Sequence, residues 1–537
     1  MKKGRFLILL LTFFVSMTAF AQKQQYSGVV VDGGGEPVIG ASVIQKGTTS
    51  GAITDLDGKF TVSVEPGSTL VISYIGYKNY ETKVSNNMRI VLEEDSKTLS
   101  DVVVIGYGVQ KKSVVTASIA KVNTEDLAST APVRMDNALK GLAAGVQVTS
   151  SSGQPGAAAR IRIRGNGTIN SDKDGPLYIV DGMPIEGGLD YLSPSDIESL
   201  EVLKDAASAA IYGARAANGV VLVTTKKGKI GKVRVNYNFS TGWQTAWKHR
   251  DVLDATSYAV LTNEAYVNAG QAAPYSDPYS YGKGTDWQDL VFNDNAPVTN
   301  HEVNVSGATE KVNYYLSMGY YKQEGIIGGN YDRSNYDRMT LRSNTKYNIF
   351  DDSKERNWLN KLDITVNASY ARIHSKAIEA NAWQGSVLGS AIALPPILTP
   401  YKNGQDALDE IKRNSASSNY VPMYTGRVDE NGVKEIFTTP GAAYHEFSNP
   451  LAKLSLPGTL NWSHKIVANF MADLQIWDNL VYHINYGVDQ SFWGYDGYTP
   501  IYYLREGESS DKTSAFSNSC RGTVWQIENT LSYDKEI

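Results

Sequence analysis

The feature that most constrains the fold of this chain is a series of long segments in which apolar and polar residues alternate. The clearest of them reads Leu362-Asp-Ile-Thr-Val-Asn-Ala-Ser-Tyr370. Because successive side chains of a β-strand point to opposite faces, this period of two predicts strands with one apolar and one polar face. We expect about eight such strands, at 233–240, 299–307, 312–320, 338–350, 362–370, 468–476, 480–488 and 525–533.

The length of these segments separates two kinds of β-protein. Strands of about ten residues with polar side chains toward a lumen are typical of transmembrane β-barrels, whereas strands of soluble sandwiches usually run about five or six residues. The 33 tyrosines, nine tryptophans and 48 glycines suit a β-rich chain with aromatic girdles. We therefore predict an antiparallel transmembrane β-barrel, with the long polar segments 242–297 and 374–464 as extracellular loops. A soluble sandwich is the alternative.

The first 21 residues have the three parts of a secretory signal peptide. The charged start consists of Lys2, Lys3 and Arg5. An apolar run, 6–20, follows, and Ala19-Phe-Ala21 fits the small-x-small cleavage pattern. Cleavage after Ala21 would make Gln22 the first residue of the mature protein. No other stretch reaches 18 apolar residues, so we expect any passage through a membrane to use β-structure.

Charge and side-chain chemistry argue against several classes of function. The net charge is −5 and no basic tract is present, which argues against nucleic acid as a partner, since phosphate binding needs clustered Lys and Arg. The single cysteine, Cys520, cannot form an intrachain disulfide, and the six histidines lie at no metal-ligand spacing. No Gly-x-Ser-x-Gly nucleophile elbow is found. We therefore expect no enzymatic activity, no metal and no cofactor.

Residues 22–95 have the pattern of a separate small β-sandwich, in which short apolar runs are divided by turns rich in Gly, Pro and Asp. A polar linker, 93–97, then leads to Asp101-Val-Val-Val-Ile105. This β-branched pentapeptide suits strand addition, in which its backbone pairs with the sheet edge of a partner. A further strand of the chain's own fold is the alternative.

The stretch 99–229 carries five distinctive blocks. They are Leu99-Ser-Asp-Val-Val-Val-Ile-Gly-Tyr-Gly108, Arg160-Ile-Arg-Ile-Arg-Gly-Asn-Gly-Thr168, Pro176-Leu-Tyr-Ile-Val-Asp-Gly-Met-Pro-Ile185, Asp196-Ile-Glu-Ser-Leu-Glu-Val-Leu-Lys-Asp205 and Ile211-Tyr-Gly-Ala-Arg-Ala-Ala-Asn-Gly-Val-Val-Leu-Val-Thr-Thr225. In this order they resemble the plug domain of TonB-dependent outer-membrane transporters. Asp101–Gly108, placed after a small all-β domain, resembles the SusC/RagA family in particular. Within 22–95, Pro37-Val-Ile-Gly-Ala-Ser-Val43 and Thr54-Asp-Leu-Asp-Gly-Lys-Phe60 resemble a carboxypeptidase-regulatory-like domain.

The resemblance implies TonB-dependent import of a large nutrient, a glycan or a peptide, across the outer membrane of a Gram-negative type of cell. The plug and the N-terminal domain would face the periplasm. The implied partners are TonB with ExbB–ExbD, a SusD-like surface lipoprotein, the glycan or peptide ligand, and outer-membrane lipid. A signal-transducing receptor and a surface-exposed binding or adhesive β-protein without transport are the alternatives.

Residue by residue, the resemblance carries over only the TonB box, which corresponds to Asp101, Val102, Val103, Val104 and Ile105. Substrate contacts in this family lie in variable loops, so no substrate-binding residue is assigned. One further expectation concerns Arg160, Arg162 and Arg164, which alternate with isoleucines and so share one strand face. We expect them to form salt bridges with carboxylates on the barrel wall; a solvated face is the alternative.

These observations together predict the domain organisation. The expected divisions are a signal peptide at 1–21, a carboxypeptidase-regulatory-like β-sandwich at 22–95, a linker with the TonB-box-like segment at 96–112, an α/β plug at 113–229 and an incomplete outer-membrane barrel at 230–537. A plug-filled barrel has about 22 strands, and the sequence ends without the terminal aromatic residue usual in such barrels. We therefore expect the front part of a transporter, truncated within the barrel.

Overall fold

The structure is a computed structural model. It describes residues 24–32, 37–38, 40–48, 50–55, 57–74, 77–92, 102–105, 108–111, 119–123, 137, 139–150, 152–165, 167–168, 174–205, 210–228, 231–351, 358–379, 382–417, 419–441, 444, 446–477 and 479–533. The chain divides into two compact units, 1–116 and 117–537. The predicted signal peptide and its cleavage site, Ala21 and Gln22, lie outside the described residues.

The first unit contains a small β-sandwich, as predicted. One sheet has the order β4-β1-β7 and the other has the order β3-β2-β5-β6. The strands are β1 (Gln24–Val31), β2 (Ser42–Gln45), β3 (Gly51–Ile53), β4 (Lys59–Val64), β5 (Thr69–Ser73), β6 (Tyr80–Lys83) and β7 (Met88–Val91). Burial alternates along β4, where Phe60, Val62 and Val64 point into the core. The same unit includes an antiparallel pair, β8 (Val102–Ile105) and β9 (Gly108–Lys111).

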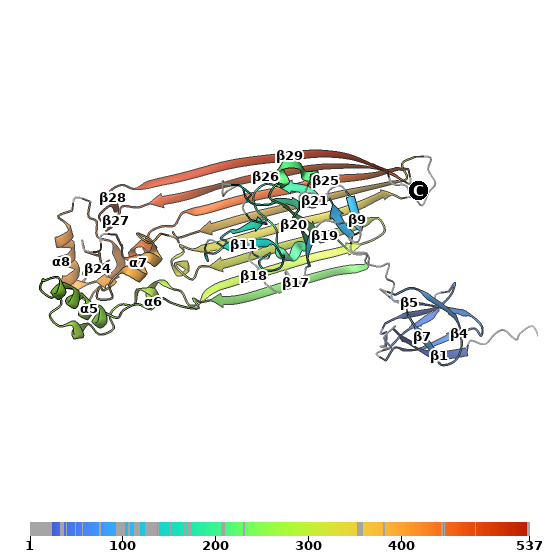
Figure 1. The fold of residues 1–537 in the computed structure, drawn as a ribbon, viewed down its shortest axis with the longest axis horizontal. Helices are drawn as coiled ribbons and strands as arrows, with labels where there is room; N and C mark the ends of the chain where they lie inside the picture. Colours follow the sequence, from blue (N-terminus) through green and yellow to red (C-terminus); the bar gives the residue numbers. More distant parts are fainter. Residues whose placement is uncertain are drawn as a thin grey trace, which may run out of the picture. The chain divides into compact units, whose positions relative to one another are not determined.

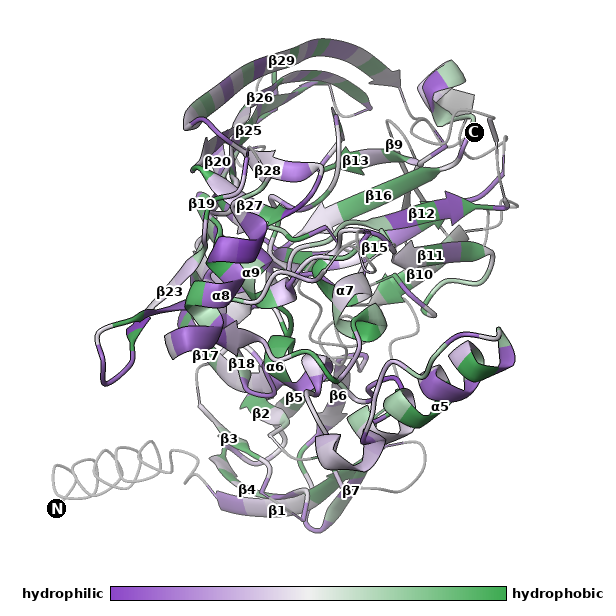
Figure 2. Ribbon diagram, turned by 90° about the vertical axis from the view of Figure 1, so that its left-hand side faces the viewer, coloured by the Kyte–Doolittle hydropathy of each residue, from purple (hydrophilic) through white to green (hydrophobic). Residues whose placement is uncertain are grey.

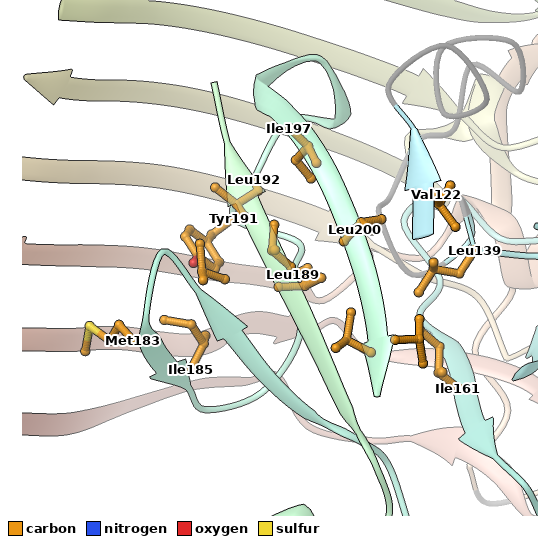
Figure 3. Packing of buried hydrophobic residues seen from close by; sticks show 14 of the residues in the cluster. Val122, Leu139, Ile161, Met183, Ile185, Leu189, Tyr191, Leu192, Ile197 and Leu200 are labelled. Carbon is orange, nitrogen blue, oxygen red and sulfur yellow. The ribbon is translucent and has the colours of Figure 1, made fainter. Parts of the chain in front are cut away.

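The second unit begins with the segment that resembles a plug. Its five-stranded sheet has the order β10-β15-β16-β13-β14, and a separate pair joins β11 to β12. The strands are β10 (Ile119–Asn123), β11 (Val146–Ser150), β12 (Ala159–Ile163), β13 (Leu177–Val180), β14 (Met183–Ile185), β15 (Ile197–Leu203) and β16 (Val220–Thr225), with 3₁₀ turns η3 (Pro194–Asp196) and η4 (Ala210–Ala216). Figure 3 shows its apolar core, in which Leu139 packs with Val122 of β10, Ile161 of β12 and Leu200 of β15.

Eight long antiparallel strands form the largest sheet of the chain, which confirms the predicted strand count (Figure 1). In sheet order they are β17 (Gly231–Gln244), β18 (Ala296–Ala308), β19 (Val312–Glu324), β20 (Asn335–Phe350), β21 (Lys361–Lys376), β25 (Leu460–Trp477), β26 (Leu480–Thr499) and β29 (Ser514–Tyr533). Each strand pairs with its neighbour along the chain, and connections at one end are short, such as 309–311 and 478–479. This up-and-down topology follows from the short turns, because a tight turn forces neighbouring strands to run antiparallel.

The two faces of this sheet differ in chemistry, as the alternation predicts. On β21, Asp363, Thr365 and Asn367 are buried, whereas Val366 is 40% exposed. Many exposed large apolar residues of the other strands, such as Phe470 on β25, share the face of Val366, whereas Trp493 and Tyr495 of β26 lie on the opposite face. Figure 2 shows the resulting hydrophilic and hydrophobic bands along β29, and it shows the plug strands on the concave side of the curved sheet. We call the concave face the inner face and the other face the outer face.

The long connections at the other end of the sheet, 245–295 and 377–459 among them, contain helices and short strands, and their extracellular position stays a prediction. We call this region the cap; it comprises 245–295, 325–334, 377–459 and 500–513 (Figure 1). Its elements are α5 (Ala255–Asn268), η5 (Pro278–Tyr281), α6 (Trp287–Val291), η6 (Gly329–Tyr331), α7 (Val387–Ala393), β22 (Tyr401–Lys402), α8 (Gly404–Asn414), β23 (Tyr424–Val428), β24 (Lys434–Phe437), α9 (Pro450–Ser455), β27 (Tyr502–Arg505) and β28 (Glu508–Ser510). A shared apolar core that includes Trp287, Leu451 and Leu504 joins segments from three of the connections. Among the described residues, no helix is both long and apolar enough to cross a membrane.

Candidate functional site

The inner face of the eight-stranded sheet holds the plug through buried polar side chains. Apolar contact between the two is limited: Ala371 of β21 and Val467 of β25 belong to the plug core. Around them, buried charged or amide residues of the sheet reach plug backbone and side chains. Buried polar groups are costly unless they find partners, and several of these residues, such as Arg342 and Lys465, lie opposite a matching group of the plug. This interface is the candidate functional site, because any movement of the plug away from the sheet would break these contacts.

The centre of the interface is Asp181, in the two-residue turn between β13 and β14. Asp181 and Gly182 have φ of 46° and 85°, and positive φ at both central residues is typical of a two-residue hairpin turn. The carboxylate of Asp181 accepts a hydrogen bond from the backbone N–H of Thr225 at 3.0 Å and another from the Thr225 hydroxyl. Arg342, on β20 of the sheet, lies 3.4 Å from the same carboxylate and also donates to the Thr225 hydroxyl. We call the eight-stranded sheet the wall. The carboxylate of Asp181 therefore links the turn between β13 and β14 to β16 of the plug, and it neutralises Arg342 of the wall.

A second cluster lies at Glu186, the first residue after this hairpin. Lys465 of β25 donates a 2.6 Å hydrogen bond to the carbonyl of Glu186 and lies 3.1 Å from Asp489 of β26. The backbone N–H of Glu186 donates to Asp489 at 3.3 Å. The Lys465 ammonium also lies over the ring of Tyr191, 5.2 Å from its centroid. The two wall charges thus neutralise each other and clamp the plug backbone between them.

A third set of contacts surrounds η3. Ser193 donates a 2.6 Å hydrogen bond to Glu302 of β18, and the hydroxyl of Tyr315 on β19 donates to Asp196 at 2.9 Å. Burial raises the pKa of Asp196 above its ordinary value, although the charge of Arg342 and hydrogen bonds from the wall act in the opposite direction. The carboxyl is therefore held by neutral hydrogen-bond donors as well as by charge.

The predicted arginine row was partly wrong. Arg160 and Arg162 do form salt bridges, at 3.0 and 2.8 Å, but both bind Asp174 of the plug itself and not a carboxylate of the wall. Arg164 lies beyond the end of β12, is exposed and has φ of 58°, so it does not continue the row. Burial alone would raise the pKa of Asp174, but the hydrogen bonds and charges of Arg162 and Arg160 outweigh it and hold that pKa below its ordinary value. The pair of arginines therefore stabilises the plug internally.

The TonB-box-like segment lies in the first unit. Val102, Val103, Val104 and Ile105 form β8, which pairs with β9 through Val102↔Lys111 to Ile105↔Gly108, whereas Asp101 lies outside the described residues. The extended conformation is the one that strand addition requires. The role of the segment in partner binding stays a prediction.

Sequence reasoning missed the interface residues on the wall, although a signal was present. Arg342 lies on the polar face of the predicted strand 338–350, whereas Lys465 and Asp489 lie just outside the predicted strands 468–476 and 480–488. Such positions would carry uncharged residues if they faced only neutral neighbours, so their charges could have indicated contact with the plug. Among the described residues, no group of three or more His, Cys, Asp or Glu side chains could hold a metal ion.

Two protein-family models match the chain. The TonB-dependent Receptor Plug Domain matches residues 111–220, and the CarboxypepD_reg-like domain matches residues 26–104. The first range begins at the last residue of β9, in the first unit, and ends at the first residue of β16, in the second unit. The second range covers the small β-sandwich and reaches into β8. The exact boundaries proposed from the sequence stay predictions.

Similar proteins extend the match across most of the chain. TonB-dependent receptor SusC of Bacteroides thetaiotaomicron is 38% identical over 418 residues, which cover 75% of this chain and 39% of that protein. TonB-dependent receptor P26 of Formosa agariphila is 34% identical over 515 residues, which cover 94% of this chain and 46% of that protein. The chain thus spans less than half the length of these relatives, which are receptors and not enzymes.

Solved structures agree with the sequence matches. The RagAB peptide importer in its open-open state has a TM-score of 0.60 at 26% identity, covering 81% of this chain and 47% of that chain. Another structure, of the RagAB peptide transporter, gives a TM-score of 0.60 at 25% identity, covering 79% and 46%. This chain is therefore a homologue of the SusC-type TonB-dependent receptors, with a CarboxypepD_reg-like domain, a receptor plug domain and a large antiparallel sheet consistent with part of the receptor β-barrel.

Proposed function

We propose that this chain works in TonB-dependent import of a large nutrient, a glycan or a peptide, across the outer membrane. The observation that carries the proposal is a plug held on the polar inner face of a sheet whose outer face is apolar. A polar lumen and an apolar exterior are the pattern of an outer-membrane barrel, and a plug inside it blocks free diffusion. The names of the relatives support the same role, since they are TonB-dependent receptors and a peptide importer.

The proposed orientation follows from the connections between strands. Outer-membrane barrels have short periplasmic turns and longer extracellular loops. The short connections would therefore face the periplasm and the cap would face the cell exterior, where a SusD-like lipoprotein partner would bind and present the ligand. The plug and the N-terminal domain would be accessible from the periplasm. Energy would come from TonB, which works with ExbB–ExbD in the inner membrane.

The proposed TonB contact is the segment Asp101–Ile105. A two-stranded antiparallel pair such as β8 and β9 is only marginally stable in water, so a partner strand can add to its edge or replace β9 at low cost. Strand addition relies on backbone hydrogen bonds, and side chains matter little. A pull on this segment would be passed along the chain to β10, which is an edge strand of the plug sheet.

The test uses proline, which removes the backbone N–H and fixes φ. N–H groups of residues two apart point to the same strand edge, so two double variants in the full transporter cover both edges: Val102→Pro with Val104→Pro, and Val103→Pro with Ile105→Pro. We expect at least one of them to abolish uptake of labelled substrate, whereas alanine at the same positions keeps most uptake. Surface binding of the substrate should persist in every variant. Full uptake in both proline variants would disprove the contact.

A further inference from the structure

The outer face of the sheet changes from apolar to charged side chains near the cap. On β21, the outer-face positions of 362–370 are all uncharged, and Arg372 and His374 follow them toward the cap. On β25, the outer-face positions of 466–474 are all uncharged, and His464 follows toward the cap. Neighbouring strands therefore share this boundary.

Four titratable side chains of three neighbouring strands lie at the boundary, and we call them the boundary cluster: Asp337 of β20, Arg372 and His374 of β21, and His464 of β25. Register places all four on the outer face, because Asp337 pairs with His374 and Arg372 pairs with His464. These strands lie in the middle of the sheet, so the exposure of the cluster does not depend on the edge strands β17 and β29.

The cluster has more hydrogen-bond donors than its single carboxylate can accept. Nη2 of Arg372 lies 3.4 Å from Asp337, and Nδ1 of His374 lies 3.8 Å from the other oxygen of the same carboxylate. The buried Nε of Arg372 has no hydrogen-bond partner among the described residues, although such groups are normally paired. The Arg372 side chain is 37% exposed, so other N–H groups of its guanidinium can reach a ligand.

The aromatic side chains beside the cluster are those found at a membrane surface. The hydroxyl of Tyr370 and Nδ1 of His464 share a hydrogen bond of 2.8 Å. Trp462 pairs with His374 and lies with its ring centroid 5.9 Å from that of His464. Tyr and Trp collect at the interface between lipid and water, at the level of the headgroups. The boundary cluster would therefore lie at headgroup level.

Two lysines on the same face flank the cluster, and each has a carboxylate of its own. Lys322 lies 3.5 Å from Glu324, and Lys376 forms an ion pair with Asp332 of the cap. Within the cluster itself, one carboxylate faces one guanidinium and two imidazoles. The partner that this set of side chains lacks is therefore a further anion.

We propose that the boundary cluster binds the phosphate of a lipid headgroup in the outer leaflet. A guanidinium binds two phosphate oxygens at once, and an imidazole donates to phosphate in its neutral and its protonated form. The apolar strip next to the cluster would contact the acyl chains of the same lipid, which a free phosphate lacks. The inference rests on the outer-membrane position in the proposed function, and it concerns the surrounding lipid instead of the imported nutrient.

The experiment measures lipid bound to the full transporter in detergent by native mass spectrometry. The probes are lipid A that carries one phosphate, the same lipid after removal of the phosphate, and inorganic phosphate as a competitor. We expect the phosphorylated lipid to bind, the dephosphorylated lipid to be lost, and an equal concentration of inorganic phosphate to displace neither. Arg372→Gln should weaken binding about tenfold, the scale of one lost charged hydrogen bond. Asp337→Asn should strengthen binding, because it removes the competing carboxylate.

The matched control is Arg413→Gln, which removes the same charge from an exposed residue of α8 in the cap. It should leave lipid binding unchanged. Equal losses for Arg372→Gln and Arg413→Gln, or equal binding of the two forms of the lipid, would overturn the site. If Arg372 and Asp337 formed only a structural salt bridge, both substitutions would act in the same direction. Unchanged heat-modifiable migration verifies that each variant is folded.

The remaining outcomes concern other occupants and the proposed function. Displacement of the lipid by inorganic phosphate would assign the cluster to a free anion and overturn the lipid. A loss of dimer mass in Arg372→Gln with unchanged lipid adducts would assign this face to a second copy of the chain, with the same consequence. Normal uptake of labelled substrate without phosphate-dependent lipid binding would refute the inference and leave import intact. Lipid binding without TonB-dependent uptake would do the reverse.

Discussion

At the scale of single residues, Asp181 shows why a plug can be firmly seated and still be removable. Its carboxylate satisfies a plug N–H, a plug hydroxyl and a wall guanidinium at once. The side chains of Asp181 and Arg342 are 9% and 3% exposed, so their charges stay paired only while the plug is in place. When the plug moves into water, both groups regain hydration, which offsets much of the lost attraction. Charged contacts therefore hold the plug at a lower net cost of release than an apolar interface of equal size would.

This account predicts the effect of Asp181→Asn. Asparagine tolerates the left-handed turn and can still accept from Thr225, but it leaves Arg342 buried without a counter-charge. We expect the opening free energy of β16 in the full transporter to fall by about 3 kcal/mol, measured by native-state hydrogen exchange. Glu186→Gln is the control, since its salt bridge with Arg215 is exposed and should contribute under about 1 kcal/mol. Adding Arg342→Met to Asp181→Asn should recover part of the loss; no recovery would mean that the pair is not the cause.

A pH prediction follows from Asp174. Its pKa in the folded chain lies below the ordinary value of 3.8, so the unfolded state binds its proton more tightly. The Arg160–Asp174–Arg162 cluster therefore stabilises the plug fully above that ordinary pKa, and the contribution is lost as the pH falls through the lower, folded value. Hydrogen exchange of β12, corrected for intrinsic rates, should show protection falling at acid pH in the wild type. Asp174→Asn should already lack that protection at neutral pH, and an unchanged acid-dependent loss in this variant would assign it to another group.

At the scale of elements, the strands were predictable and the cap was not. Local alternation alone predicts that residues such as Asp363, Thr365 and Asn367 share one polar face. Short connections, such as the one between β25 and β26, favour antiparallel pairing of the strands they join. The cap has no such period, because its core gathers Trp287, Leu451 and Leu504 from connections far apart in sequence. The partner of Arg160 and Arg162 was missed for the same reason: Asp174 lies in a loop whose approach depends on tertiary structure. The alternation of apolar and polar residues thus predicts the strands, whereas contacts between residues far apart in the sequence are found only in the three-dimensional structure.

The loop between β11 and β12 gives a prediction at this scale. A Cβ at Gly156 would lie 2.0 Å from the ring of the buried Tyr336, and the backbone there has φ of +69°. Gly156→Ala should therefore displace the loop and break the paired hydrogen bonds of Gln154 with Ile378, at 2.6 and 3.0 Å. The positive φ alone costs about 1–2 kcal/mol. Proteolysis between 150 and 158 should become faster.

Gly153 provides a matched control in the same loop. No atom lies within 4 Å of a Cβ built on it, and its φ is not in the left-handed region. Gly153→Ala should leave the rate of proteolysis within twofold of the wild type, an estimate for surface changes of under about 0.5 kcal/mol. Equal acceleration by both substitutions would mean that the loop responds to lost glycine flexibility and not to the contact with Tyr336.

At the scale of the whole molecule, the sheet separates three environments. The outer face carries a band of large apolar side chains, the inner face is charged beside the plug, and the inner face of β25, β26 and β29 is uncharged and aromatic toward the cap. The sequence alone predicts the difference between the outer and inner faces, since alternation along a strand shows which set of side chains is apolar. It does not predict the change along the inner face, because Trp493 and Phe492 look alike in sequence and differ only in the face to which register assigns them.

The outer face leads to a last prediction, on charge placed in lipid. Phe470, in the middle of β25, is 42% exposed on the outer face, and Leu474 lies on the same face nearer the end of the strand. Lysine at a bilayer midplane costs about 2–4 kcal/mol, falling to about 0–1 kcal/mol near an interface. In the full transporter folded into liposomes, Phe470→Lys should therefore destabilise more than Leu474→Lys. Ser463→Lys, on the inner face of the same strand, should have little effect on folding. Equal losses at Phe470 and Leu474 would indicate that a protein layer, as in a soluble sandwich, covers this face, since only a bilayer grades the cost of a charge with depth.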